Sequence, residues 1–349
     1  MKLKTAFKYI VGIVLMVLFL YFAFDDTDFG HLWYILSHAN YWWALAMFPV
    51  LLLSHMVRAW RWEYLLRPVK KELRYRNLFS AMMVGYMMNN VLPRAGELVR
   101  PYAIGKLEGV SRTTAFGTVL IERMFDIFSF MIVIALIPFA YTGPLTQVFP
   151  WLEDVGIWIT LITISLLGIF SFLMFRRDIV MKFLNYFTRH ASLRTAKFAE
   201  HITHSFLDGF LFIKEPRNYF LIALLSAIIW ILYIIMMYLP FYAFNLTERY
   251  SLDLGSAIVV QAISSIGYLM PTPGAIGPYH YFTIQTLTKL YGVNEDVARS
   301  YATITHAIGY IGITVIGLYY FLRDKLHMTE VMKQESSKQD VVAEPDRAS

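Results

Sequence analysis

The hydrophobic residues of this chain gather into runs, and six of the runs are uninterrupted and close to the ~20 residues that cross a bilayer as a helix. They predict six membrane-spanning helices. These runs cover residues 7–24, 41–57, 113–140, 156–175, 219–244 and 301–322. Because almost all of the hydrophobic pattern is accounted for by helices of this length, we predict an all-α, polytopic integral membrane helix bundle.

Two further apolar segments, 78–107 and 254–290, are interrupted near the middle by proline and glycine. Proline lacks a backbone N–H and clashes with the preceding helical turn, so a straight helix does not continue through it. We therefore predict a break in each segment. The residues expected to shape the breaks are Pro93, Gly96, Pro271, Pro273, Gly274 and Gly277.

The distribution of lysine and arginine predicts how the chain is threaded through the membrane. The stretch 58–76, which includes Arg58 and Arg61, holds seven of these residues and 176–217 holds eight, whereas 25–40 and 141–155 hold none. The positive-inside rule places both basic stretches and both termini in the cytoplasm. Each interrupted segment must then enter and leave on one side, which predicts two re-entrant helical hairpins of opposite orientation.

The two predicted hairpins also resemble each other in sequence. Residues 78–84 and 254–260 are identical at four of seven positions, and a Gly-Val pair follows each hairpin. Ser111 and Asn294 come next as predicted N-caps of a long helix. This repeated order predicts an inverted repeat, which transporters use to form a substrate site near the bilayer midplane. Chance similarity between apolar segments is the alternative, because such segments draw on few residue types.

The composition indicates that most of the chain belongs to the membrane domain. Charged residues make up 16% of the chain, below the ~25% of soluble domains, so we predict one transmembrane domain over residues 1–322. The polar tail 323–349 is expected to be disordered and cytoplasmic. Residues 196–213 have the spacing of an amphipathic helix at the inner surface, where a simple connector is the expected role.

The charge and the cysteine count exclude several kinds of partner and chemistry. The net charge is +6, but the basic residues lie in blocks beside apolar segments, so no nucleic-acid partner is predicted. The chain has no cysteine, which excludes disulfides, thiolate metal sites and cysteine nucleophiles. No cofactor, metal or catalytic residue is predicted.

Ionisable and polar residues near the breaks are the candidate site, because a charge at bilayer depth costs at least ~2.5 kcal/mol and faces a partner or a wet cavity. Guanidinium groups bind phosphate oxygens bidentately, so the arginines would meet a lipid headgroup and the acids would position them. The candidate substrate-binding residues are Asn90, Arg94, Arg100, Arg123 and His280, and the supporting residues are Glu97, Glu122, Asp126 and His306. The alternative is an internal ion-pair network that only ties the first hairpin to the bundle.

The second repeat replaces these charges. An offset of 183 residues puts Thr305, His306 and Gly309 where the first repeat has Glu122, Arg123 and Asp126. His280 and His306 could titrate near neutral pH and couple transport to protons. A hydrogen-bonded histidine with a structural role is the more common case, and no acidic pair accompanies these two.

Three ordered motifs, NVLPRAGELVR at 90–100, ERMFD at 122–126 and PTPGAIG at 271–277, resemble the flippase-like transmembrane family, also called the lysylphosphatidylglycerol synthase transmembrane region. The resemblance covers roughly residues 7–322. It implies a membrane domain that in some relatives translocates aminoacylated phosphatidylglycerol and in others accompanies polyprenyl-linked glycan pathways. The aminoacyltransferase domain of the synthases has no counterpart in the 27 residues after position 322, so we expect no enzyme. His280 departs from the family pattern, which often has glutamate there.

We therefore expect a plasma-membrane transporter or flippase for a phospholipid or a polyprenyl-linked lipid. One alternative is a membrane glycosyltransferase or an accessory protein of lipid-linked glycan synthesis, in which Asp26 and Asp28 would form a metal-binding pair. Two carboxylates in a short loop are more commonly plain solvated residues. The other alternative is a scaffold that does not transport lipid. The presence of two interrupted helical segments argues against it, because a scaffold does not need them.

Overall fold

The computed structural model describes residues 3–143, 148–150 and 218–326, together with isolated positions between 157 and 168. All regular secondary structure in these residues is helical, which confirms the predicted all-α class. The predicted span 156–175 lies outside the described residues except for those isolated positions. The amphipathic segment 196–213 and the tail from residue 327 also lie outside them.

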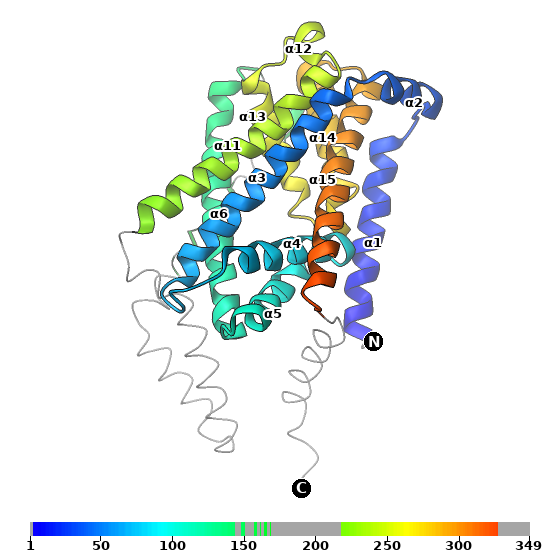
Figure 1. Ribbon diagram of the computed structural model, residues 1–349. Helices are drawn as coiled ribbons and strands as arrows, with labels where there is room; N and C mark the ends of the chain where they lie inside the picture. The colour runs from blue at the N-terminus through cyan, green and yellow to red at the C-terminus, as the bar shows by residue number, and fades with distance from the viewer. Residues whose placement is uncertain are drawn as a thin grey trace.

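The described helices pack into a bundle, with the N-terminus at the lower end in Figure 1. In chain order they are α1 Leu3–Phe24, α2 Phe29–His38, α3 Tyr41–Leu66, α4 Tyr75–Val91, α5 Gly96–Glu108, α6 Arg112–Ala140, α11 Tyr219–Ala243, α12 Leu246–Arg249, α13 Leu254–Gly267, the short 3₁₀ helix η3 Pro273–Ala275, α14 Pro278–Tyr291 and α15 Glu295–Arg323.

The bundle exposes large apolar side chains and buries several charged ones within a mainly apolar core. By length and composition α3, α11 and α15 are able to cross a membrane, and the part of α1 from Tyr9 together with α2 passes the same test although 84° separates their axes. Large apolar side chains such as Val14, Phe139 and Phe220 are exposed, whereas Arg61 and Glu122 are completely buried. An exposed apolar surface of this kind suits contact with lipid.

Two predicted loop regions are helical. α3 continues to Leu66, nine residues beyond the predicted end of the span at 57, so Arg58 and Arg61 lie inside a helix and not in a solvated loop. The helix continues because Trp62, Leu65 and Leu66 keep one side of it in the core. In the segment 25–40, Asp28 caps the ten-residue helix α2.

Both predicted interruptions are places where the chain leaves α-helical geometry. α4 ends at Val91 and α5 begins at Gly96, with Arg94 between them at φ 60°. Between α13 and α14, Gly274 and Gly277 have φ values of 55° and 92°. α4 packs on α5 and α13 packs on α14, so each interrupted segment folds back on itself, the first in the lower part of the bundle and the second in the upper part (Figure 1).

The two interruptions are in contact with each other and with α1. α4 and α1 both pack against η3, which lies within the second interruption. Arg94 Nη2 donates to the carbonyl oxygen of Leu269 at 2.9 Å. Asn90 Nδ2 donates to Thr314 Oγ1 at 2.9 Å, and Tyr310 OH donates to the Asn90 carbonyl at 3.1 Å. These contacts join the two interruptions to each other, while Val91, Arg94 and Leu269 remain exposed.

The same order of elements follows each interruption. α5 and α14 end at Gly109 and Gly292, whose φ values of 68° and 63° are left-handed and favour glycine. The predicted N-caps are confirmed: the side chain of Ser111 accepts the Thr114 N–H, and that of Asn294 accepts the N–H of Asp296 and Val297. Each cap starts a helix of 29 residues, α6 or α15.

Candidate functional site

A buried cluster of charged residues is centred on the carboxylate of Glu122 in α6. This side chain is completely buried, and its two oxygens accept hydrogen bonds from different helices. Arg58 Nη2 of α3 donates to Oε1 at 2.9 Å, and Arg100 Nη2 of α5 donates to Oε2 at 2.6 Å. Glu122 therefore joins α3 and the first hairpin to α6.

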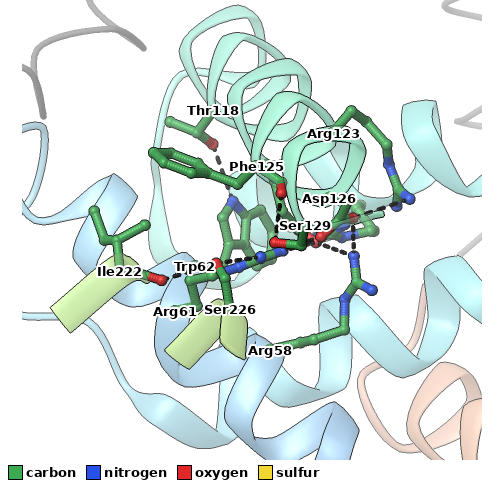
Figure 2. Close-up of polar contacts among 12 residues, drawn as sticks. Arg58, Arg61, Trp62, Thr118, Arg123, Phe125, Asp126, Ser129, Ile222 and Ser226 are labelled. Atoms are coloured by element: carbon green, nitrogen blue, oxygen red, sulfur yellow. Dashed lines mark hydrogen bonds and ion pairs between the residues drawn. The ribbon is translucent and has the colours of Figure 1, made fainter. Parts of the chain in front are cut away.

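Asp126 lies four residues further along α6, on the same side of the helix. Its carboxylate accepts a hydrogen bond from Arg61 Nη2 at 2.6 Å and a very short one from Arg58. Arg123 Nη1 contacts it from another side at 3.4 Å. Figure 2 shows Arg58 and Arg123 reaching Asp126 from separate helices.

The arginines of α3 are held by further contacts. Arg58 Nη1 donates to Tyr233 OH at 2.7 Å and Arg61 Nη1 donates to Ser226 Oγ at 2.8 Å, and both acceptors belong to α11. The Arg100 guanidinium lies 4.3 Å from the centre of the Trp62 ring, a cation–π distance. Four helices therefore meet at this cluster, and the guanidinium groups have little freedom to move.

Arg100 occupies the space above a glycine of the facing helix. A Cβ atom added to Gly85 of α4 would lie 2.2 Å from Arg100 Cγ, so a side chain at position 85 would displace the arginine. Gly96 N–H donates to Asn89 Oδ1 at 2.7 Å, which holds the start of α5 against α4. Close packing within the first hairpin thus places Arg100 opposite Glu122.

The cluster carries an excess of one positive charge. The three buried guanidinium groups of Arg58, Arg61 and Arg100 face two carboxylates. Arg123 and Glu97, which are about one-third exposed and 3.9 Å apart, add one charge of each sign. A buried ion pair repays its desolvation only when its geometry is good, and an unbalanced buried charge costs more still. The excess favours the binding of an anion.

The region around the second interruption is polar but uncharged at the positions that correspond to the charged cluster by the 183-residue offset. His306 Nε2 lies 2.9 Å from the carbonyl oxygen of Gly274, and because a carbonyl only accepts, this nitrogen carries the hydrogen. The His280 and His306 ring centres are 4.7 Å apart. Tyr279 OH and Thr305 Oγ1 share a hydrogen bond of 2.8 Å. Hydrogen bonds therefore take the place of the ion pairs at these corresponding positions.

Residues 9–317 match the family described as the lysylphosphatidylglycerol synthase TM region. The chain belongs to this family. The UPF0104 membrane protein MJ1595 of Methanocaldococcus jannaschii is 24% identical over 331 residues, which are 91% of this chain and 95% of that protein. A UPF0104 membrane protein of Methanothermobacter thermautotrophicus is 26% identical over 271 residues, 74% of this chain and 78% of that protein. The resemblance drawn from the motifs is confirmed, and the protein is a membrane protein.

The structure separates the predicted substrate-binding residues of this family member into three places. Arg100 and Arg123 lie in the charged cluster with Glu97, Glu122 and Asp126. Asn90 and the exposed Arg94 lie where the two interruptions meet. His280 and His306 contact each other near the second interruption.

Arg58 and Arg61 are central members of the cluster. The sequence pattern instead predicts that both arginines lie in a loop. The spacing of Ser54, Arg58, Arg61 and Leu65 continues the helical period of α3 beyond residue 57, and all four are buried. This period is the sequence signal that predicts a longer helix, whereas the two positive charges favour a position at the membrane surface. Tyr233 in α11 had no signal of its own, because its role depends on the packing of α11 against α3.

Asp28, considered above as a member of a metal-binding pair, has a structural use. Its Oδ1 accepts the N–H groups of Gly30 at 2.8 Å and His31 at 3.1 Å, which caps the start of α2. Among the described residues no group of three or more histidine, aspartate and glutamate side chains is arranged to hold a metal ion.

Proposed function

We propose that this protein is a transporter of the flippase type for a phospholipid or polyprenyl-linked lipid with an anionic headgroup. The headgroup binds where the first interrupted segment meets the charged cluster, within the hydrocarbon layer. The observation that carries the proposal is the completely buried Glu122, held between Arg58 and Arg100 in a cluster with one excess positive charge.

The energetic argument starts from the cost of burying charge. The effective penalty for burying an ion remains several kcal/mol even after relaxation, and here three buried arginines meet the completely buried Glu122 and the partly buried Asp126 in a bundle with an apolar exterior. A scaffold needs no such cluster, since apolar residues of similar volume pack as well or better. A phosphate group that enters the cluster satisfies guanidinium hydrogen bonds and balances the charge.

The arrangement in the membrane is part of the same proposal. The chain has six spans and two re-entrant hairpins, and the units α4–α6 and α13–α15 are related as an inverted repeat in the plasma membrane, with both termini in the cytoplasm. Its support is the repeated order of elements, the two capped 29-residue helices and the contact between the two interruptions. Transporters with inverted repeats place their substrate site at such interrupted helices.

We also propose that the protein is not an enzyme. Its family corresponds to the transmembrane region of the synthases, and Asp28 is used as a helix cap. The binding residues are Arg100 and Arg123, with Asn90, Arg94 and His280 along the path between the two interruptions and His306 as a supporting residue.

The test is lipid translocation by the purified chain in liposomes. Fluorescent phospholipid and polyprenyl-phosphate probes are compared for the wild type, for Arg94→Ala combined with Arg123→Ala, and for Arg67→Ala. Both arginines of the double variant are at least partly exposed, so the fold should persist. Arg67 is a matched control, a partly exposed arginine that pairs with Glu63 outside the cluster.

We expect the wild type and Arg67→Ala to move one class of probe, and the double variant to be at least roughly ten-fold slower, which corresponds to about 1.4 kcal/mol. A wild type that moves neither class faster than protein-free liposomes contradicts the function. Equal rates for the double variant and the wild type contradict the assigned site.

A further inference from the structure

Polar atoms without a hydrogen-bond partner are concentrated in and beside the charged cluster. In the described part of the chain eleven buried side-chain nitrogen or oxygen atoms have no hydrogen-bond partner, and eight of them belong to this region. They are His55 Nδ1 and Nε2, Arg58 Nε, Arg61 Nε, Tyr86 OH, Arg100 Nε and Nη1, and Arg123 Nε. Folded proteins pair about 90% or more of such atoms, so this concentration points to a ligand.

Four of these residues, His55, Arg58, Tyr86 and Arg100, form what we call the donor cluster. The His55 and Tyr86 ring centres are 4.8 Å apart, and the Arg58 guanidinium lies 5.7 Å from the centre of the Tyr86 ring. Arg58 and Arg100 both donate hydrogen bonds to Glu122. α3, α4 and α5 therefore bring the four side chains together beside Glu122.

The chemistry of the donor cluster suits an oxyanion. Guanidinium N–H groups and the phenol O–H are donors, and a neutral imidazole offers one more N–H. The carboxylates of Glu122 and Asp126 are already occupied by the other N–H groups of the same arginines. The remaining positive charge is one unit, so a ligand with one negative charge leaves the buried site neutral, whereas a dianion leaves it with an uncompensated charge.

We propose that the donor cluster is the binding site of a phosphate-type oxyanion with a single negative charge, and that it selects a phosphodiester over a phosphomonoester or a pyrophosphate. The inference rests on the proposed function in taking a lipid headgroup as the source of the phosphate. It narrows the substrate to lipids whose phosphate links two organic groups.

The experiment measures equilibrium binding to the purified full chain in detergent at pH 8.5, where a phosphomonoester carries close to two charges. The probes are dioctanoyl phosphatidylglycerol as the phosphodiester, dioctanoyl phosphatidic acid as the phosphomonoester, and dioctanoylglycerol without phosphate. Dimethyl phosphate, a soluble phosphodiester anion, distinguishes a free oxyanion from a lipid headgroup. Dissociation constants come from ligand-induced shifts of the unfolding temperature.

We expect the phosphodiester lipid to bind at least roughly ten-fold tighter than phosphatidic acid. Tyr86→Phe, which removes one donor, should weaken its binding about five-fold. Tyr75→Phe is the matched control, since Tyr75 OH donates to the Met56 carbonyl outside the cluster, and it should leave binding unchanged. Binding of dimethyl phosphate with the same variant pattern supports the oxyanion site and shows that the lipid chains are not required.

A charge variant gives the sharper test. Asp126→Asn raises the excess positive charge by one unit with almost no change of volume, so it should move the preference of the site towards phosphatidic acid. Asp253→Asn, at a helix cap far from the cluster in the sequence, controls for the loss of a carboxylate. A wild type that prefers phosphatidic acid, or an Asp126→Asn variant with an unchanged preference, overturns the inference.

This result is separable from the transport result. Binding with the expected charge preference in a protein that moves no lipid supports the oxyanion site and contradicts the proposed function. Transport that depends on Arg94 and Arg123 but shows no phosphodiester preference contradicts the oxyanion site. It still supports the proposed transport function.

Discussion

The units α4–α6 and α13–α15 share an order of elements but differ in their polar chemistry. Each has a pair of helices separated by an interruption, a glycine in the left-handed conformation, an N-capping residue and a helix of 29 residues. Glu97 and Arg123 of the first unit correspond by the 183-residue offset to His280 and His306 of the second, and both pairs are in contact, at 3.9 Å and at a ring separation of 4.7 Å. The backbone arrangement therefore keeps these positions adjacent whatever side chains they carry.

The difference shows what the charges require from the rest of the bundle. The first unit depends on Arg58 and Arg61 of α3 to compensate Glu122 and Asp126, so its stability depends on a helix outside the unit. At the corresponding positions the second unit pairs its polar groups within itself, Tyr279 with Thr305 and His306 with the Gly274 carbonyl. Each prediction below tests or refines this contrast.

The largest expected effect is that of Glu122→Gln. The substitution removes the carboxylate that pairs with Arg100 and leaves Arg58 paired with Asp126 alone, so the free energy of unfolding should fall by roughly 3–5 kcal/mol. The measurement is unfolding of the purified protein by sodium dodecyl sulfate titration. Glu97→Gln is the control, because that side chain is about one-third exposed and lies 3.9 Å from Arg123, and it should cost under about 1 kcal/mol. Equal losses at both positions would contradict the central role of Glu122.

The next prediction transfers a charge pair between the units. His306→Arg alone buries an unpaired charge in the second unit and should destabilise the protein by about 3 kcal/mol. Adding His280→Glu recreates the Glu97–Arg123 pair at the corresponding positions and should recover at least half of the loss. The same titration measures the coupling in a double-mutant cycle. A double variant as unstable as the sum of the two single variants would show that the two units are not equivalent in structure.

A smaller effect is expected from Thr305→Val, which occupies the position in the second unit that corresponds to Glu122. It removes the hydroxyl that pairs with the buried Tyr279 OH and should cost roughly 1–2 kcal/mol. Thr303→Val, which loses only a bond to the carbonyl of its own helix, provides the baseline. A loss as large as that of Glu122→Gln would remove the contrast between the charged positions of the first unit and the uncharged corresponding positions of the second.

The smallest effect should be the same in both units. Gly109→Ala and Gly292→Ala introduce no clash, because nothing lies within 4 Å of the added Cβ atom, but both keep a left-handed backbone. Each should cost about 1 kcal/mol, seen as a small fall in unfolding temperature. Clearly unequal losses would mean that the two helix ends differ in tertiary packing and not in backbone strain alone.

The sequence predicted much of the local structure because its causes are local. Ser111 and Asn294 cap the helices that they are predicted to cap, and helical geometry is lost near Pro93 and Pro273. Proline alone does not explain the two breaks, because α13 already ends at Gly267 and both Pro101 and Pro138 lie inside helices. The assignment of Arg58 and Arg61 to a loop was wrong, since a count of positive charges does not distinguish a solvated arginine from one paired inside the bundle.

By itself the sequence determined the membrane class, the all-α architecture and the repeated order of elements. These follow from hydrophobic run lengths, from prolines and from capping residues, which act within a few positions along the chain. Only the tertiary structure decided which arginines meet Glu122 and Asp126, and that the two interruptions touch each other. Ion pairing depends on distances between helices that are far apart in the sequence, and those distances exist only once the bundle has packed.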